Sequence, residues 1–248
     1  MQLKKLICFF CAAIFFLVAC DKESVTGDAS SATGKGGSLA RFTISGNFLY
    51  LADYSTIRIF DISNPPNTIE KNPVPVAFDV ETIFPYKDKL FIGSTQGMYV
   101  YSLANPAIPV KLGSVTHVRS CDPVVANDTI SYTTLQGNGK CGAAESGLYI
   151  YDIKTITAPV QKKLLPLSTP YGLGLMDSVI FVCRGDNGLS AISVKDPSNP
   201  KIMYTRKDGS YMDVIPYDNL LICYISTGIL IYDAFDLKNI VKLGNVNY

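Results

Sequence analysis

The pentapeptide Ile57-Arg58-Ile59-Phe60-Asp61 alternates apolar and polar residues as a half-buried β-strand does, and closely similar pentapeptides follow at regular intervals. The later copies are MYVYS at 98–102, LYIYD at 148–152, LSAIS at 189–193 and ILIYD at 229–233. Their fourth residues are 60, 101, 151, 192 and 232, so successive intervals are 41, 50, 41 and 40 residues. The chain therefore repeats one unit five times, with a single insertion of about nine residues in the third unit.

Each unit holds three further apolar segments around this pentapeptide. One precedes it after an Asp/Asn turn, another lies further upstream, and a fourth follows a Pro/Asn loop, as at 110–115 in the second unit. Four strands in a radially repeated unit of 40 residues are typical of a β-propeller blade. The sequence predicts an all-β fold, a five-bladed β-propeller of four-stranded antiparallel blades, over residues 39–248. Stacking between neighbours explains nearly continuous apolar strands such as 179–182.

The repeats resemble the LVIVD repeat family, whose name spells this strand and its terminal Asp. The matching segments are 57–61, 148–152 and 229–233, and the fourth unit adds the family-like tail VKDPSNP at 194–200. Units two and four depart from the pattern, because their strands end in Ser102 and Ser193. The resemblance implies an exported or surface repeat protein without an agreed catalytic activity, and it supplies no catalytic residues.

The N-terminus has the features of an export signal. Lys4 and Lys5 precede an uncharged run from 6 to 19, which is too short for a membrane-spanning helix but typical of a signal peptide. The following LVAC, ending at Cys20, resembles the bacterial lipobox. We therefore expect a signal peptide at 1–19, then a lipidated Cys20 and a flexible Gly/Ser-rich tether at 20–38. This predicts an exported bacterial lipoprotein, attached through its N-terminal lipid to the outer membrane, either periplasmic or surface-exposed.

Composition excludes several classes of function. A net charge of +1 with 17% charged residues argues against nucleic acid as a partner, because phosphate contacts need clustered Lys and Arg. His117 is the single His of the chain, which disfavours multi-His zinc sites and Ser-His-Asp catalysis. We expect no metal, no cofactor and a monomeric protein.

Four cysteines remain after the signal and the lipid site. Cys183 and Cys223 lie on second strands, where other units have Leu51 and Ile92, so we expect them to be small core residues. Cys121 lies at the start of the third unit and Cys141 in its insertion. Both positions belong to the same end of an up-and-down blade. In an oxidising compartment, this predicts a Cys121–Cys141 disulfide.

An aspartate ends the repeated strand in three units, at Asp61, Asp152 and Asp233. These carboxylates could bind cations, or they could accept backbone N–H bonds in the turn that follows. We favour the role in the turn, because each repeat contains the same turn and stabilises it with the same type of residue.

The candidate binding surface is the end of the propeller where inner strands start and where second strands turn into third strands. The insertion at 136–144 overhangs this end and is the loop that breaks the repeat, which makes it the first place to expect a ligand. The polar and aromatic candidates at this end are Arg41, Asp79, Glu81, His117, Arg119, Asp122, Lys140, Tyr171, Asp208, Tyr211 and Asp213.

Three functions are compatible with these features. The leading hypothesis is a non-enzymatic, lipid-anchored binding module for an envelope protein or a glycan. The alternative is a carbohydrate-active hydrolase or lyase, with a carboxylate pair drawn from Asp79, Glu81, Asp122 and Asp213. A third is a structural subunit of an envelope complex, which would show a large exposed apolar patch on a blade edge instead of a pocket.

Overall fold

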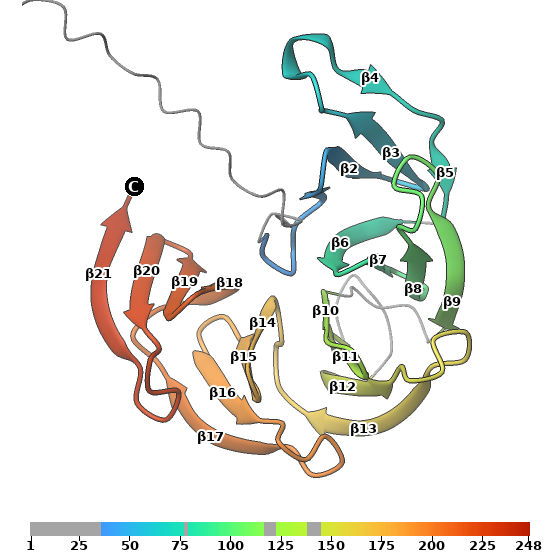
Figure 1. Cartoon of the computed structure of the whole chain (residues 1–248). Coiled ribbons are helices and arrows are strands. Elements are labelled where there is room, and N and C mark those ends of the chain that lie inside the picture. Colours follow the sequence, from blue (N-terminus) through green and yellow to red (C-terminus); the bar gives the residue numbers. More distant parts are fainter. Residues whose placement is uncertain (1–35, 77–78, 117–122, 138–144) are drawn as a thin grey trace, which may run out of the picture. The chain divides into compact units, whose positions relative to one another are not determined.

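Five antiparallel β-sheets follow one another along the chain and are arranged as blades around a centre (Figure 1). The structure is a computed structural model, and it describes residues 36–76, 79–116, 123–137 and 145–248. In blades 2 to 5, successive strands are hydrogen-bonded neighbours. The predicted all-β fold, a five-bladed β-propeller, is confirmed.

The strands of each blade run from the centre outward in sequence order. Blade 1 contains β1 (Phe42–Ser45), β2 (Phe48–Asp53), β3 (Thr56–Asp61), the 3-10 helix η1 (Pro65–Asn67), β4 (Ile69–Glu70) and β5 (Val74–Pro75). Blade 2 contains β6 (Val80–Tyr86), β7 (Lys89–Ser94), β8 (Gly97–Ser102) and β9 (Val110–Thr116). Blade 3 contains β10 (Val124–Ala126), β11 (Ile130–Leu135), β12 (Gly147–Asp152) and β13 (Val160–Pro166). Blade 4 contains β14 (Leu173–Met176), β15 (Val179–Cys183), β16 (Leu189–Ser193) and β17 (Lys201–Arg206). Blade 5 contains β18 (Tyr211–Tyr217), β19 (Leu220–Ile225), β20 (Gly228–Asp233) and β21 (Val241–Asn247).

The repeated pentapeptide is the third strand of every blade. In blades 2 to 5 the register between the third and fourth strands shifts at one place, for example between Val100 and Tyr101 and between Ile150 and Tyr151. Such a bulge increases the local twist of a strand. In blade 1, the fourth strand is replaced by two short segments, β4 and β5, which both pair with β3.

The strand-end aspartates stabilise the turns that follow them. Oδ1 of Asp61 accepts the N–H of Ser63 at 3.1 Å, and Oδ1 of Asp233 accepts the N–H of Phe235 at 2.8 Å. Asp152 makes the same bond to the N–H of Lys154 at 3.0 Å. The Oγ of Ser102, which replaces the aspartate in blade 2, accepts the N–H of Ala104 at 3.1 Å. The predicted turn role is confirmed.

The apolar core is divided among the junctions between consecutive blades. Four clusters of buried side chains fill the junctions of blades 1 and 2, 2 and 3, 3 and 4, and 4 and 5. Inner strands also pack along this path, β6 against β1, β10 against β6, β14 against β10 and β18 against β14. Each of blades 2, 3 and 4 is therefore covered on both faces, as the continuous apolar strands predicted.

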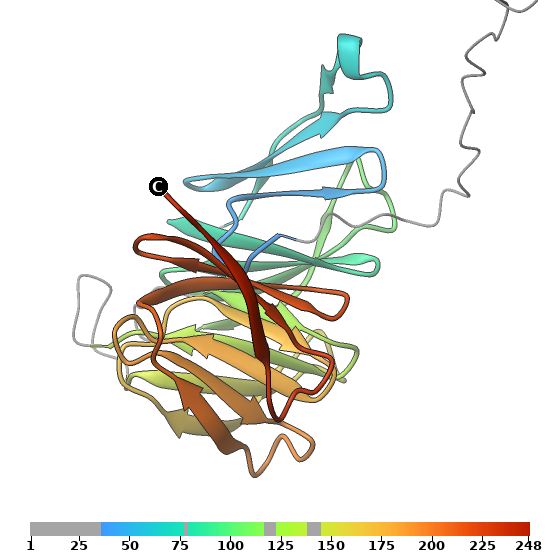
Figure 2. The ribbon, with the colours of Figure 1, turned by 90° about the vertical axis from the view of Figure 1, so that its left-hand side faces the viewer.

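Blades 1 and 5 are covered on one face only. Among the described residues, no core cluster joins these two blades, and Figure 1 shows them on either side of an opening in the ring. Figure 2 views the ring from the side of β21, whose residues are almost all exposed. The open face of blade 5 consists of Leu220, Ile222, Tyr224, Ile229 and Ile231. The open face of blade 1 contains Phe42, Ile44, Leu49, Leu51 and Phe60, together with Arg58, which forms an ion pair with Glu70.

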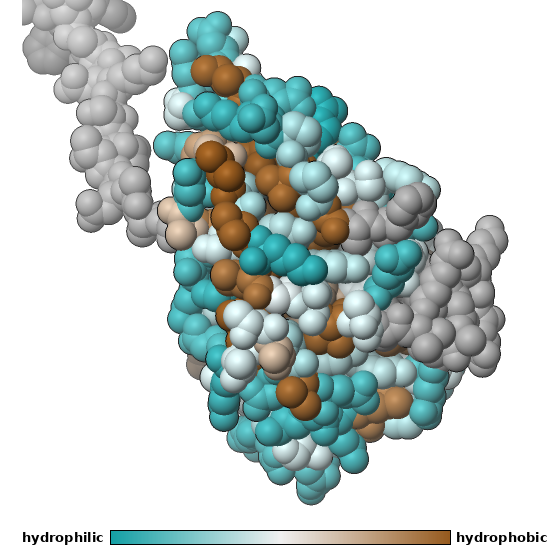
Figure 3. Space-filling view, turned by 90° about the vertical axis from the view of Figure 1, so that its right-hand side faces the viewer, coloured by the Kyte–Doolittle hydropathy of each residue, from teal (hydrophilic) through white to brown (hydrophobic). Residues whose placement is uncertain are grey.

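The side of the ring opposite β21 is mainly hydrophilic (Figure 3). Figure 3, which faces the outer strands on the other side of the ring, shows separate apolar patches among hydrophilic residues. Exposed apolar side chains on outer strands and loops include Ile69, Ile108, Val110 and Val160. Within the described residues, no helix has the length and apolar character needed to cross a membrane.

Candidate functional site in the central channel

The segment Gly36–Leu39 runs through the middle of the propeller. Ser38 is 1% exposed, and its hydroxyl donates to Oδ1 of Asp213 at 3.1 Å. The Oγ of Ser38 also accepts the backbone N–H of Leu173 at 2.7 Å. One serine thus connects the inner strand of blade 4 with that of blade 5, just before the chain enters blade 1. We call this contact the Ser38 latch.

Asp213 is the carboxylate on which the latch depends. It also accepts the backbone N–H groups of Val214 at 2.9 Å and of Leu39 at 3.4 Å. Burial raises the pKa of Asp213 above its ordinary value, and the hydrogen bonds from Val214, Leu39 and Ser38 oppose this rise. Its neighbours are packed tightly, because a Cβ atom at Gly37 or at Gly172 would collide with this carboxylate.

A cavity of about 430 Å³ occupies the channel beside the latch. Its deeper wall includes Ser38 and Leu173, and its mouth lies at the turns between first and second strands, marked by Asn127, Asp177 and Asp218. Most of the wall is apolar, and the remaining lining residues are Gly36, Phe84, Pro85, Tyr86, Val125, Ala126, Gly174, Leu175, Met176, Val214 and Pro216. This volume is within the range of small-molecule sites, which are mostly apolar with few polar groups.

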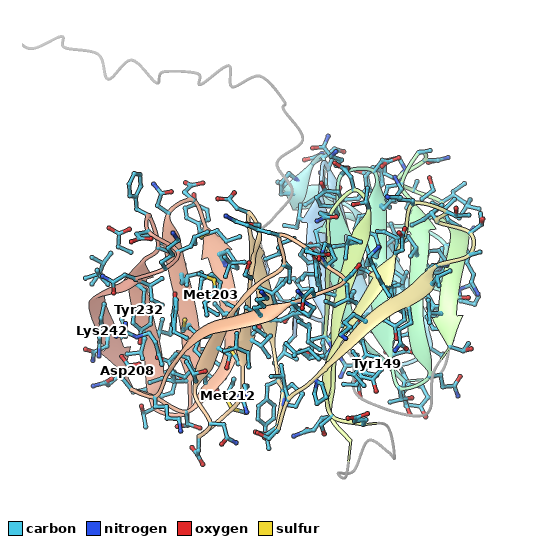
Figure 4. The ribbon with its side chains drawn as sticks, turned by 90° about the horizontal axis from the view of Figure 1, so that it is seen from below. Tyr149, Met203, Asp208, Met212, Tyr232 and Lys242 are labelled. Carbon is cyan, nitrogen blue, oxygen red and sulfur yellow. The ribbon has the colours of Figure 1, made fainter. Side chains whose placement is uncertain are left out.

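A second polar cluster lies between blades 4 and 5. Tyr211 donates its hydroxyl to Oδ1 of Asp208 at 2.6 Å, and the Tyr232 hydroxyl donates to Oδ2 at 2.9 Å. The two hydroxyl oxygens are 2.6 Å apart, and the Arg206 guanidinium lies 5.0 Å from the centre of the Tyr232 ring. Figure 4 shows where Asp208 and Tyr232 lie in the molecule. Burial alone would raise the pKa of Asp208. The hydrogen bonds from Tyr211, Tyr232 and Arg206 outweigh it and hold this pKa at about 2.

Arg206 extends this cluster to the outer edge of blade 5. Its Nη1 donates to the carbonyl of Ile240 at 2.9 Å, and its Nη2 lies 3.5 Å from Oδ2 of Asp208. A shallow hollow of about 410 Å³ lies over Arg206, Asp208 and Lys238. Because Tyr211 and Tyr232 donate to Asp208, and Arg206 connects Asp208 with the carbonyl of Ile240, we assign this cluster to the joining of blades 4 and 5.

The structure separates the predicted site residues. Tyr211 is fully buried in the core between blades 4 and 5, and Asp213 lies in the latch. Arg41 is exposed and donates from Nη2 to the carbonyl of Val80 at 3.2 Å, while Asp79 and Glu81 flank that residue. The Tyr171 carbonyl accepts the Thr134 hydroxyl at 2.5 Å. Among these candidates, Asp208 and Tyr211 contact each other, and this contact is structural.

Several predictions concern residues outside the described ones. These are His117, Arg119, Asp122 and Lys140 of the candidate surface, and the Cys121–Cys141 disulfide. The signal peptide and Cys20 are also outside them. The remaining cysteines behave as expected: Cys183 and Cys223 are buried free thiols in one core cluster, and burial raises the pKa of Cys223 to about 12.

Sequence reasoning did not identify Ser38 or the mouth of the cavity. Ser38 belongs to a run of small residues that the sequence analysis assigned to the tether, and small size is what lets Gly37 and Ser38 fit against Asp213. The mouth lies at the opposite end of the inner strands from the predicted surface. The sequence feature that could have located the mouth of the cavity is the apolar composition of the inner strands next to their turns, as in FPY at 84–86.

Comparison with known proteins supports the repeat and the fold. Residues 36–75 match the family model of the LVIVD repeat, which confirms the resemblance in the first unit. No curated protein matches the chain in sequence.

Solved structures of low sequence identity share the fold. The periplasmic gluconolactonase PpgL of Pseudomonas aeruginosa has a TM-score of 0.63 at 14% identity, over 82% of this chain and 68% of that one. The computationally designed protein Ika8 has a TM-score of 0.59 at 14% identity, over 83% and 60%. A hypothetical selenium-binding protein from Sulfolobus tokodaii has a TM-score of 0.56 at 12% identity, over 82% and 59%. The chain spans 59 to 68% of the length of these proteins, and at such identities the likeness concerns the fold alone.

Proposed function

We propose that this β-propeller with an LVIVD repeat is a lipid-anchored binding module of the bacterial cell envelope, and that its ligand enters the channel cavity. The observation that carries the proposal is the cavity itself, about 430 Å³, with apolar walls and a polar mouth. Such a site fits an apolar group of an exported protein or the apolar face of a sugar ring, with Asn127, Asp177 and Asp218 positioned to bind polar groups at the mouth.

The surroundings of Asp213 favour binding over glycoside hydrolysis. A retaining or inverting hydrolase needs two carboxyl groups at about 5–5.5 or 6.5–9.5 Å from each other. The raised pKa of Asp213 results from burial, and the interactions that oppose it are hydrogen bonds from Val214, Leu39 and Ser38. These donors hold the carboxylate within the latch, which is a structural use of the group.

Blocking the cavity tests the proposal. The purified protein is first screened against envelope glycans and exported proteins by biolayer interferometry. Leu175→Trp then fills the cavity, and Ile108→Trp places the same side chain on the exposed surface as a matched control. We expect Leu175→Trp to weaken binding at least tenfold and the control to leave it unchanged, with equal melting temperatures. Unchanged affinity of Leu175→Trp would contradict the cavity as the site.

Deletion of 136–144 distinguishes the two ends of the channel. If the ligand enters the cavity from the mouth at Asn127, Asp177 and Asp218, the deletion leaves affinity unchanged. If the deletion abolishes binding and Leu175→Trp leaves the affinity unchanged, the binding site lies at the insertion and not in the cavity.

The lipid anchor has its own test. We expect the full chain to partition into the detergent phase after Triton X-114 extraction of the producing bacterium, and Cys20→Ser to be recovered in the aqueous phase. A Cys20→Ser variant that still enters the detergent phase would contradict lipidation at Cys20.

A further inference from the structure

The charged side chains that line the channel cavity have the same sign. Among the described residues that line it, the charged ones are Asp177 and Asp218, and none is a lysine or an arginine. Both aspartates are exposed, and they lie in the turns between the first and second strands of blades 4 and 5. Two carboxylates at the entrance of an apolar hollow concentrate a negative potential there.

The turns themselves do not require a carboxylate. Asp177 has a φ of 51° and Asp218 a φ of 49°, the left-handed conformation that favours Gly, Asn and Asp. In the corresponding turns of blades 1 and 2, the same position is occupied by Gly46, with a φ of 56°, and by Lys87, with a φ of 52°. Because a glycine and even a lysine are accepted there, the shape of the turn does not explain an acidic residue in both blades 4 and 5.

The side of the mouth formed by blades 2 and 3 shows how this setting holds an ammonium group. The Lys87 ammonium forms an ion pair with Asp128 and lies 5.4 Å from the centre of the Tyr86 ring, which lines the cavity. An ammonium beside a carboxylate and over an aromatic ring is stabilised by both. Lys87 neutralises Asp128, whereas no described residue forms an ion pair with Asp177. The carboxylate of Asp177 therefore keeps its negative charge available at the mouth.

We propose that the channel cavity binds an apolar group that carries a positive charge, such as an alkylammonium chain, with its charge beside Asp177 and Asp218. This inference rests on the proposed function, because it names the class of ligand for the same cavity. The wall offers Phe84, Leu175 and Met176 to the apolar part. A charge deep within such a wall would be costly, so the charged end remains at the mouth. An anion would be repelled by the two carboxylates.

Three probes with the same six-carbon chain test the charge preference: hexylammonium, hexanol and hexanoate. Isothermal titration calorimetry of the purified protein measures their affinities at low ionic strength, where charge attraction is least screened. We expect hexylammonium to bind about tenfold more tightly than hexanol, and hexanoate to bind more weakly than either. Equal affinities for hexylammonium and hexanol would overturn the proposal, and so would a lack of hexylammonium binding.

Neutral variants of the two aspartates locate the charge. Asparagine has nearly the same size and is also favoured in the left-handed conformation, so the turns are kept. We expect Asp177→Asn to weaken hexylammonium binding about threefold, and Asp177→Asn with Asp218→Asn about tenfold, with hexanol unchanged. Asp186→Asn is the matched control, because Asp186 is an exposed aspartate in the turn between the second and third strands of blade 4, at the other end of the channel. If the doubly substituted chain binds hexylammonium as tightly as the parent, the proposal is wrong.

Leu175→Trp separates a failure of this inference from a failure of the proposed function. If the cavity is the site, Leu175→Trp weakens the binding of both hexylammonium and hexanol. Equal affinities for the two probes, both lost in Leu175→Trp, would overturn the charge preference and leave the cavity as the site. Unchanged hexylammonium binding in Leu175→Trp would overturn both.

Two peptides distinguish the sources of such a group. Each is a capped peptide of four glycines around a central residue, which is lysine in one and norleucine in the other. Tighter binding of the lysine peptide would support the proposal with a lysine side chain of an exported protein as the ligand. Binding of hexylammonium without a difference between the peptides would support it with a free amine as the ligand.

Discussion

The third strands of blades 3 and 5 have nearly the same sequence and very different surroundings. Strand β12 reads GLYIYD and β20 reads GILIYD. In β12, five consecutive residues are buried, whereas in β20 buried and half-exposed residues alternate. The same local sequence thus forms the same strand in both places, and the presence or absence of a neighbouring blade decides whether one face or both are covered.

The largest expected effect comes from truncating equivalent isoleucines in these two strands. Ile150→Ala should lower the free energy of unfolding by about 2–5 kcal/mol, because it leaves a cavity between blades 3 and 4. Ile231→Ala should cost about 1 kcal/mol or less, because this side chain is partly in solvent and its site can be filled by water. Urea unfolding, at protein concentrations where sedimentation velocity shows a monomer, measures the free energy of unfolding of both variants.

This pair of variants also tests whether the face is open. Equal losses for Ile150→Ala and Ile231→Ala in the monomer would mean that blade 5 is covered on both faces. The comparison between the two blades would then be wrong.

The next effect concerns the connection between blade 5 and the start of blade 1. Ser38→Ala removes the donor to Asp213 and the acceptor for the N–H of Leu173, leaving buried polar groups unpaired. We expect a loss of about 1–3 kcal/mol in urea unfolding. Ser198→Ala, at an exposed serine, is the control and should change stability by less than about 0.5 kcal/mol. An unchanged free energy of unfolding in Ser38→Ala would show that the Ser38 latch does not stabilise the fold.

A smaller effect is expected at the junction of blades 4 and 5, in the pH dependence of stability. The depressed pKa of Asp208 stabilises the fold fully above about pH 4, and this contribution is lost as the pH falls towards 2. Tyr211→Phe removes one hydrogen bond to the carboxylate, so the pKa should rise towards its ordinary value of 3.8. Loss of stability between pH 4 and 2 should then become shallower.

NMR titration of the Asp208 carboxyl carbon follows this pKa directly. Tyr204→Phe serves as the control, because the Tyr204 hydroxyl donates to the carbonyl of Leu237 at 2.9 Å and makes no bond to Asp208. An unchanged Asp208 pKa in Tyr211→Phe would show that the Tyr211 hydroxyl does not support the carboxylate.

The smallest effect is expected at the strand ends. Asp233→Ala removes the bond to the N–H of Phe235 in an exposed turn and should cost about 0.5–1.5 kcal/mol. Thermal unfolding with and without 5 mM CaCl₂ completes the test. Because the carboxylate serves the turn, calcium should leave the melting temperature of both proteins unchanged. A calcium-dependent increase that the variant lacks would restore the cation-binding interpretation.

The fold was predictable because its information is local and repeated. Five pentapeptides in register, each ending before a turn, define the strands and the number of blades, and the turn role of Asp61 could be inferred from its recurrence. The candidate site was less accessible. Tyr211 and Asp213 are two residues apart in sequence, yet Tyr211 lies in the core between blades 4 and 5 and Asp213 lies in the Ser38 latch. Their separation depends on the register shift in β18, between Tyr211 and Asp213.

The sequence by itself determined the repeat, the strands, the turns and the predicted export signal, since each depends on residues close together in the chain. Tertiary structure decided what lies between the blades. It placed Ser38, from a stretch with the composition of a tether, against Asp213, and it formed a cavity from inner strands of four blades. It also left one apolar face of blade 1 and one of blade 5 uncovered. The pattern of a strand specifies that a face is apolar, and only the position of the neighbouring sheet specifies what covers it.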